Sequence, residues 1–515
     1  MRRLSPILCG VILYLAYLAE ARPLTAVAGQ IPAPAPRSIV VIGDLHMGPG
    51  RQADPPAAGD ADPDRDGAGT GWHPYEDFRW RDEFIRFLGA LSAESGDTDL
   101  VINGDLFELL QSTAVPCTYD DPALGCTAEE ALQRLETVIR GHAEELEAIG
   151  RFAAAGSNRV HIVPGDHDAA LLMAPVWRRA VASFGAPPDR VALAVSGRWI
   201  SPDGRVHVEH GHQLPLSADR FSNWPNPVIT SDGRSHLERP WGEQVILPFY
   251  NRTEARYPIV DNIAEEGVGA KFVAAAMGAD RPERVPPLLR FLLTKTSWQQ
   301  FRMDLDDGDV QAPAWDVKQI RSNLATFVAG SLPSDDPLAG VVKNTTAEHL
   351  SAVGEMLSDQ QIIAVCDYRA AIRRARRRME RVLTQLTGTG PPVAECPRLP
   401  ETVGPAFEYY WRSRDQQVAQ HVEDARGLDV IVFGHTHLLD RPFRPLGDDG
   451  PVVVTSGAWQ RTIHPVHIEQ LGAQPESLAP CYTFIRLPAS RGTRTAEARS
   501  WRLNEQQQWT MGGGC

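Results

Sequence analysis

Five short polar clusters in the sequence carry the aspartate and histidine side chains that bind divalent metal ions in proteins. Each follows a short apolar run rich in valine and isoleucine, the pattern of a buried strand that ends at a polar edge. One such cluster is common in turns, but several at successive strand ends indicate a shared metal centre. The clusters are Asp44-Leu45-His46, Gly104-Asp105, Gly165-Asp166-His167-Asp168, Glu209-His210-Gly211-His212 and Gly434-His435-Thr436-His437.

This mixture of carboxylates and imidazoles suits Mn, Fe or Zn. Two divalent cations about 3.5 to 4 Å apart make a bridging water nucleophilic and shield the oxygens of a phosphoryl group. Such a reaction also needs a donor for the leaving oxygen. The clusters therefore predict an enzyme that hydrolyses a phosphate ester or anhydride with a metal-bound hydroxide. Monoesters, diesters and nucleotide-sugar pyrophosphates are all open as substrates.

The clusters resemble the motifs of the calcineurin-like metallophosphoesterase family, which are D-x-H, G-D, G-N-H-D/E, H and G-H-x-H in that order. The resemblance covers residues 38 to about 212 and 428 to about 459. It implies a dinuclear centre with seven protein ligands. Asp44, His46 and His437 would bind one metal ion, Asp166, His210 and His435 would bind the second, and Asp105 would bridge the two.

The same resemblance implies a catalytic pair beside the metal ions. His167 would face the scissile phosphate and stabilise or protonate the leaving oxygen, and Asp168 would orient the His167 ring. One position departs from the family pattern, because Asp166 stands where an asparagine is usual. The extra negative charge would bind the second cation more tightly and weaken its Lewis acidity. Alternatively, Asp166 points elsewhere and the second metal site is weak.

A polar and aromatic loop follows the fourth cluster and is the expected place of substrate recognition. His212, Arg220 and Asn223 are the candidate substrate-binding residues in this loop. His212 is as readily a structural histidine, and the loop could instead pack beneath the segment that follows it. The expected substrate is a phosphorylated small molecule, a nucleotide or a lipid head group.

The elements that position the clusters form a mostly β-α-β pattern. Strands are expected at 38–42, 100–102, 160–163, 206–208, 430–433 and 452–455, and helices at 76–91, 128–155 and 169–184. Together with the resemblance, this order implies an α/β fold, a four-layer α/β/β/α sandwich with the metal centre at the strand ends. The core would comprise residues 38–238 and 426–515, separated by a large, mainly helical insertion at 239–425.

The N-terminus reads as a secretory signal over residues 1–28, with a positive end, an apolar centre and small residues at the cleavage site. Export to the periplasm or the extracellular space is therefore expected, and an uncleaved N-terminal membrane anchor is the alternative. Disulfides persist after export. Cys117 and Cys126 are the predicted pair because they bracket one short loop.

Charge narrows the range of partners. The 515-residue chain has a net charge of −14, which argues against duplex nucleic acid because basic side chains dominate that affinity. An arginine-rich run at 373–378 could contact a membrane surface or a second phosphate, although a solvated helix face is the more ordinary reading. Nothing in the sequence indicates an oligomeric state. The rival interpretation is a non-catalytic, metal-containing envelope protein that binds a partner through its helical insertion.

Overall fold

The computed structural model describes residues 36–51, 71–240, 243, 427–462 and 477–513, apart from short gaps at 74, 95–96, 113, 122, 215–218, 446–447, 449 and 491. The predicted signal at 1–28, nearly all of the predicted insertion at 239–425 and the basic run at 373–378 lie outside the described residues. Within the described ranges, no helix has the length and hydropathy that crossing a bilayer requires.

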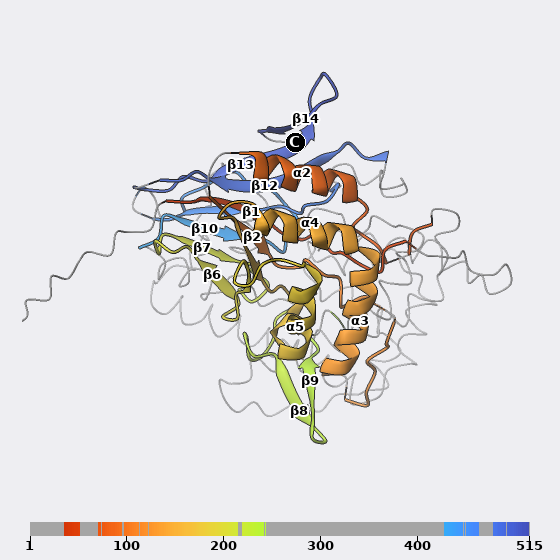
Figure 1. The fold of residues 1–515 in the computed structure, drawn as a ribbon. Helices are drawn as coiled ribbons and strands as arrows, with labels where there is room; N and C mark the ends of the chain where they lie inside the picture. The colour runs from red at the N-terminus through yellow and green to blue at the C-terminus, as the bar shows by residue number, and fades with distance from the viewer. Residues whose placement is uncertain are drawn as a thin grey trace, which may run out of the picture. The chain divides into compact units, whose positions relative to one another are not determined.

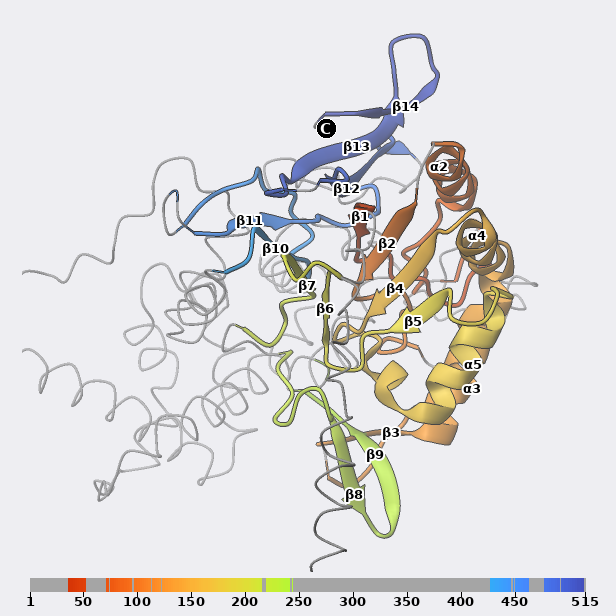
Figure 2. The same ribbon diagram turned by 60° about the vertical axis from the view of Figure 1, so that its left-hand side comes forward.

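The larger of two main sheets has seven strands in the order β14-β13-β12-β1-β2-β4-β5. Figure 1 labels the strands from β14 to β2, and Figure 2 labels β4 and β5 as well. The strands β1 (Ser38–Ile42), β2 (Thr98–Asn103), β4 (Arg159–Val163) and β5 (Val191–Leu193) are parallel. The strands β12 (Cys481–Leu487), β13 (Glu497–Leu503) and β14 (Trp509–Gly512) extend the sheet in antiparallel fashion from β1. The carboxyl ends of β1, β2 and β4 therefore meet at one edge.

The second sheet has four strands in the order β11-β10-β7-β6. The strands β7 (Val206–Glu209), β10 (Val430–Phe433) and β11 (Val452–Thr455) are parallel, and β6 (Arg198–Ile200) is antiparallel to β7. β7 pairs directly with β10 although residues 210–429 separate them in the sequence. The pairing therefore joins the two predicted parts of the core, which the predicted insertion separates in the sequence.

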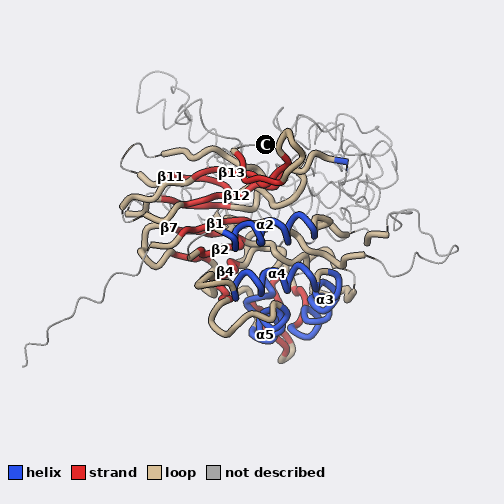
Figure 3. Tube along the Cα trace, turned by 45° about the horizontal axis from the view of Figure 1, so that its top comes forward, coloured by secondary structure: helices blue, strands red, loops and turns tan. Residues whose placement is uncertain are grey.

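Helices cover one face of the seven-stranded sheet, and the four-stranded sheet covers the other (Figure 2). The helices are α2 (Arg81–Ala93), α3 (Ala128–Gly141), α4 (Ala143–Ala154) and α5 (Ala174–Ser183), preceded by the 3₁₀ turn η1 (Ala169–Leu172). Figure 3 shows them grouped on one side of the strands. α3 begins with a capping box in which Thr127 and Glu130 each accept a backbone N–H of the other.

Successive side chains of a strand point to opposite faces of the sheet, so a single apolar run contributes to two apolar cores. On β1, Val40 and Ile42 pack with the helices, whereas Ile39 and Val41 pack against residues of the four-stranded sheet such as Val208. This confirms a mixed α/β fold with strands buried on both faces. Among the described residues one helical layer packs on the two main sheets, so the outer helical layer of the predicted four-layer sandwich is not confirmed.

A small third sheet was not predicted. It joins β3 (Leu124–Thr127), β9 (Arg234–Glu238) and β8 (Val228–Ser231). The β8–β9 hairpin turns through Asp232 and Gly233, both at positive φ, and an Asp-Gly pair between strands is a strong hairpin signal that was available in the sequence. The predicted disulfide between Cys117 and Cys126 is confirmed, and it ties this sheet to the preceding loop.

Candidate metal centre

The five predicted clusters come together at the carboxyl ends of β1, β2, β4, β7 and β10. Backbone hydrogen bonds join the turns to one another, since the amide of Asp44 donates to the carbonyl of Gly104 over 3.1 Å and that of Gly434 donates to the carbonyl of His210 over 2.8 Å. These bonds cross between strands that are far apart in the sequence. The ligand-bearing turns thus form one connected edge.

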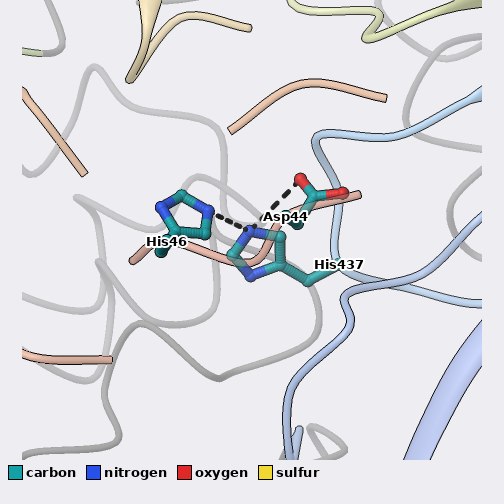
Figure 4. A group of neighbouring side chains, drawn as sticks. All are labelled: Asp44, His46 and His437. Carbon is teal, nitrogen blue, oxygen red and sulfur yellow. Dashed lines mark hydrogen bonds and ion pairs between the residues drawn. The ribbon is translucent and has the colours of Figure 1, made fainter. Parts of the chain in front are cut away.

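The first group of side chains consists of Asp44, His46 and His437 (Figure 4). The Nε2 atoms of His46 and His437 lie 3.2 Å apart, and His437 Nε2 lies 3.5 Å from Asp44 Oδ1. Asp44 Oδ2 is buried and accepts no hydrogen bond from any described residue. A buried carboxylate oxygen without a hydrogen-bond donor is suited to bind a cation.

The second group consists of Asp166, His210 and His435. Asp166 Oδ1 lies 3.0 Å from His210 Nε2 and 3.3 Å from His435 Nδ1. Of the two alternatives left open for Asp166, the structure has it pointing into this group. The carboxylate is therefore available to the same cation as the two imidazoles.

Asp105 lies between the two groups. Its Oδ2 is 2.9 Å from His210 Nε2 in the second group and 3.8 Å from His46 Nε2 in the first. The amide of His167 donates to the other oxygen, Oδ1, over 3.0 Å. Asp105 is thus the carboxylate that faces both sets of ligands, as a bridging ligand must.

The backbone around the ligands leaves little freedom. His210 Nδ1 lies 2.9 Å from the carbonyl of Asn103. Because a carbonyl only accepts, Nδ1 carries a proton, and Nε2 is the nitrogen that would bind a metal ion once its own proton is displaced. Two glycines make the close approach feasible. A Cβ on Gly104 would lie 2.0 Å from His210 Nδ1, and one on Gly165 would lie 2.0 Å from Asp105 Oδ1.

Five of the seven candidate ligands occupy the left-handed region of backbone space, which non-glycine residues rarely adopt. Their φ angles are 52° for Asp44, 50° for His46, 52° for Asp105, 69° for His435 and 58° for His437. Strained backbone of this kind persists where the surrounding structure holds it, and it concentrates at functional sites. The backbone conformation of these turns therefore brings the candidate ligand side chains close together.

Burial and mutual charge shift the protonation of the cluster. Burial raises the pKa of Asp44 to about 6. Burial alone would lower the pKa of His210, but the carboxylates of Asp105 and Asp166 outweigh it and raise that pKa well above its ordinary value. Protons on these groups supply the positive charge that the carboxylates require. A divalent cation would replace them, so binding would release protons.

The expected role of Asp168 does not match its position. Its Oδ1 accepts the amide of Gly165 over 2.8 Å and its Oδ2 accepts the amide of Leu106 over 2.9 Å. Burial raises its pKa to about 7. Asp168 therefore fastens the turn after β4 to the turn after β2, and another carboxylate orients the His167 ring.

That carboxylate belongs to Glu108, which the sequence analysis missed. Glu108 Oε2 lies 2.5 Å from His167 Nδ1 and 3.1 Å from His46 Nδ1, so it holds one candidate ligand and the candidate acid together. Its Oε1 accepts the amides of Leu110 and Gln111 over 2.8 and 2.7 Å. The available signal was a lone charged residue within the apolar run Leu106-Phe107-Glu108-Leu109-Leu110.

The three candidate substrate-binding residues fall in different environments. His212 is 1% exposed, its ring meets Trp224 edge-on, and its Nδ1 is 4.0 Å from Asp166 Oδ1. Burial lowers its pKa to about 3, so the ring is neutral. The structure thus brings His212 to the second group as a buried neighbour. Arg220 is half-buried and Asn223 is exposed.

A second residue missed in the sequence is Asp219, whose Oδ2 lies 3.7 Å from His435 Nε2. At this distance, which is longer than a hydrogen bond, the Asp219 carboxylate is a charged neighbour of the ring nitrogen remote from Asp166. A single aspartate in a loop offers no sequence signal for that role.

Comparisons with known proteins found no relative of this chain. No known protein-family model matches it, and no protein of curated function does either.

Proposed function

We propose that the protein is an exported, dinuclear metallophosphoesterase of the calcineurin-like type, which hydrolyses a phosphate ester or anhydride. The observation that carries the proposal is Asp105, whose carboxylate faces two separate groups of one aspartate and two histidines. Mn, Fe and Zn all suit these ligands. When bound, two such cations supply a nucleophilic hydroxide and shield the phosphoryl oxygens.

The residues of the chain supply the remaining requirements. His167 Nδ1 is held by Glu108, while His167 Nε2 faces the second group, 3.8 Å from Asp166 Oδ2. Burial alone would lower the pKa of His167, but Glu108 and Asp105 outweigh it and raise that pKa well above its ordinary value. In the metal-free protein His167 is therefore protonated at neutral pH, and its Nε2 is the nitrogen that would give a proton to the leaving oxygen.

The Cys117–Cys126 disulfide supports export, because disulfides persist outside the reducing cytosol. We infer that the signal at residues 1–28 directs that export, with an uncleaved anchor as the competing form. The two packed sheets and one helical layer are also the larger part of a four-layer α/β/β/α sandwich, and we propose that fold for the whole core. Comparing the N-terminus of the mature protein with residue 29 tests the cleavage.

Hydrolysis of chromogenic phosphate monoesters and diesters tests the function. The metal-free mature protein is assayed alone and with Mn or Zn, beside His167→Ala and Asp105→Asn. Asp189→Asn, an exposed change of the same kind, is the control. Turnover that needs metal and falls at least about a hundredfold in His167→Ala supports the proposal. Metal binding without turnover on any ester or pyrophosphate favours a non-catalytic binding protein.

A further inference from the structure

Asp166 belongs to the second ligand group and also lies beside the proposed acid. Its Oδ1 lies 3.0 Å from His210 Nε2 and 3.3 Å from His435 Nδ1, whereas its Oδ2 lies 3.8 Å from His167 Nε2. His167 Nε2 is the nitrogen that serves the leaving oxygen in the proposed reaction. A phosphoryl group within reach of that nitrogen therefore lies close to the negative charge of Asp166.

The charge of the two ligand groups depends on three aspartates. Asp44, Asp105 and Asp166 are 0%, 1% and 4% exposed. In the described part of the chain their ion-pair partners are all histidines, and no arginine or lysine pairs with them. Two divalent cations, when bound, carry four positive charges. The three carboxylates offset three of these, so one positive charge remains.

This remaining charge bears on which phosphate ester binds. A phosphodiester carries one negative charge, whereas a phosphate monoester carries nearly two at neutral pH. One net positive charge therefore matches a diester, and an amide at position 166 would leave two and match a monoester. Asp219 adds a further carboxylate 3.7 Å from His435 Nε2. Charges act strongly in a buried site, so this difference affects affinity.

Resting on the proposed function, we propose that the carboxylate of Asp166 makes the protein select singly charged phosphodiesters over doubly charged monoesters. Water adds its oxygen to phosphorus, the bond between phosphorus and the leaving ester oxygen breaks, and that oxygen takes a proton from His167. One proton of the water replaces the proton that His167 gave up. The products are an alcohol and a phosphate monoester.

The substrates p-nitrophenyl phosphate and its methyl ester test the proposal, because they share a leaving group and differ by one charge. The metal-saturated wild type is expected to have the higher kcat/KM on the methyl ester. In Asp166→Asn the ratio of kcat/KM for the monoester to that for the diester should rise roughly ten- to a hundredfold. Asp189→Asn, at an exposed position, should keep the wild-type ratio.

Two further readouts separate charge selection from the chemistry. Asp166→Asn should bind its second metal ion more weakly than wild type, as a metal titration measures. Calorimetry on the metal-loaded proteins compares phenylphosphonate, a doubly charged probe at mildly alkaline pH, with methyl(phenyl)phosphinate, which is singly charged. Neither probe has an ester bond to hydrolyse. Asp166→Asn should shift the ratio of the two affinities toward the phosphonate, and Asp189→Asn should not.

The outcomes distinguish this inference from the proposed function. A shifted affinity ratio without turnover of either ester would support the charge selection and overturn the proposed function alone. Metal-dependent turnover with a wild-type preference for the monoester, or with unchanged ratios in fully loaded Asp166→Asn, would overturn the charge selection and leave hydrolysis in place. If Asp166→Asn does not load two ions, the wild-type preference between the two esters decides.

Discussion

Two clusters of buried carboxylates and imidazoles lie in the same core, and they differ in whether each side chain has its own partner within the protein. In the helix-side cluster, formed by Glu76, His142 and Glu145, His142 Nε2 lies 3.1 Å from Glu76 and its Nδ1 lies 3.1 Å from Glu145. Each nitrogen has one carboxylate partner. In the metal centre, by contrast, nitrogens and carboxylates from five turns converge on shared points.

The difference shows how geometry separates a closed structural cluster from a group of similar side chains that could hold a metal ion. The carboxylate of Glu76 also accepts the amides of Phe78, Gly48 and Gly50, so its hydrogen-bonding capacity is used. In the metal centre Asp44 Oδ2 has no donor among the described residues. The helix-side cluster is a closed network, and it fastens the loop that directly follows His46.

The sharpest way to break the comparison is to remove the carboxylate that faces both ligand groups. Asp105→Asn keeps the shape of the side chain and removes its charge, so hydrolysis is expected to fall at least about a thousandfold. Bound metal should fall with it. Steady-state kinetics and metal analysis on the same preparation provide the check. Retained turnover with full metal content would contradict the bridging role.

The matching change in the helix-side cluster should act on stability instead. His142→Gln leaves two buried carboxylates without their cation, which typically costs about 3 kcal/mol or more. Urea unfolding measures the difference in the free energy of unfolding, and Glu144→Gln on the exposed face of α4 is the control. The folded variant should still bind metal. Loss of metal without loss of stability would reverse the roles assigned to the two clusters.

The same cluster gives a pH dependence of known sign. Burial alone would lower the pKa of His142, but Glu76 and Glu145 outweigh it and raise that pKa from 6.5 to about 10. A raised histidine pKa stabilises the folded state fully below pH 6.5, and the contribution disappears as pH rises through about 10. The stability gap between wild type and His142→Gln should therefore narrow from pH 6.5 upward. A gap that widens over this range is the contrary result.

Substitutions of Glu108 and Asp168 should differ in how they change the pH dependence of hydrolysis, and this effect is smaller than the preceding ones. Replacing an outer carboxylate of this kind costs roughly 10- to 100-fold in activity or metal affinity. Glu108→Gln also lowers the pKa of His167, so the alkaline limb of the pH–rate profile should move to lower pH. Asp168→Asn should leave that limb in place, because Asp168 contacts backbone amides. If the alkaline limb moved in Asp168→Asn and not in Glu108→Gln, Asp168 would be the residue that orients the His167 ring, as the family resemblance implied.

The sequence predicted the parts of the site that repeat a local rule. The rule that a polar cluster follows a buried apolar run located the five clusters, because alternation and strand ends are local properties, whereas the choice of seven candidate ligands within them came from the family resemblance. The sequence did not predict Glu108 and Asp219 as part of the site, because their partners, His167 and His435, are distant in the chain. The helix predicted at 76–91 begins only at Arg81, since Glu76 serves the loop after β1 instead.

Metal stoichiometry tests the central claim most directly. The mature protein is stripped with a chelator, titrated with Mn or Zn, and the tightly bound ions per chain are counted, alongside Asp105→Asn and His142→Gln. The account predicts two ions per chain in wild type and in folded His142→Gln, and loss of tight binding in Asp105→Asn. A wild-type chain that binds no ion tightly, or two ions that persist without the Asp105 carboxylate, would contradict it.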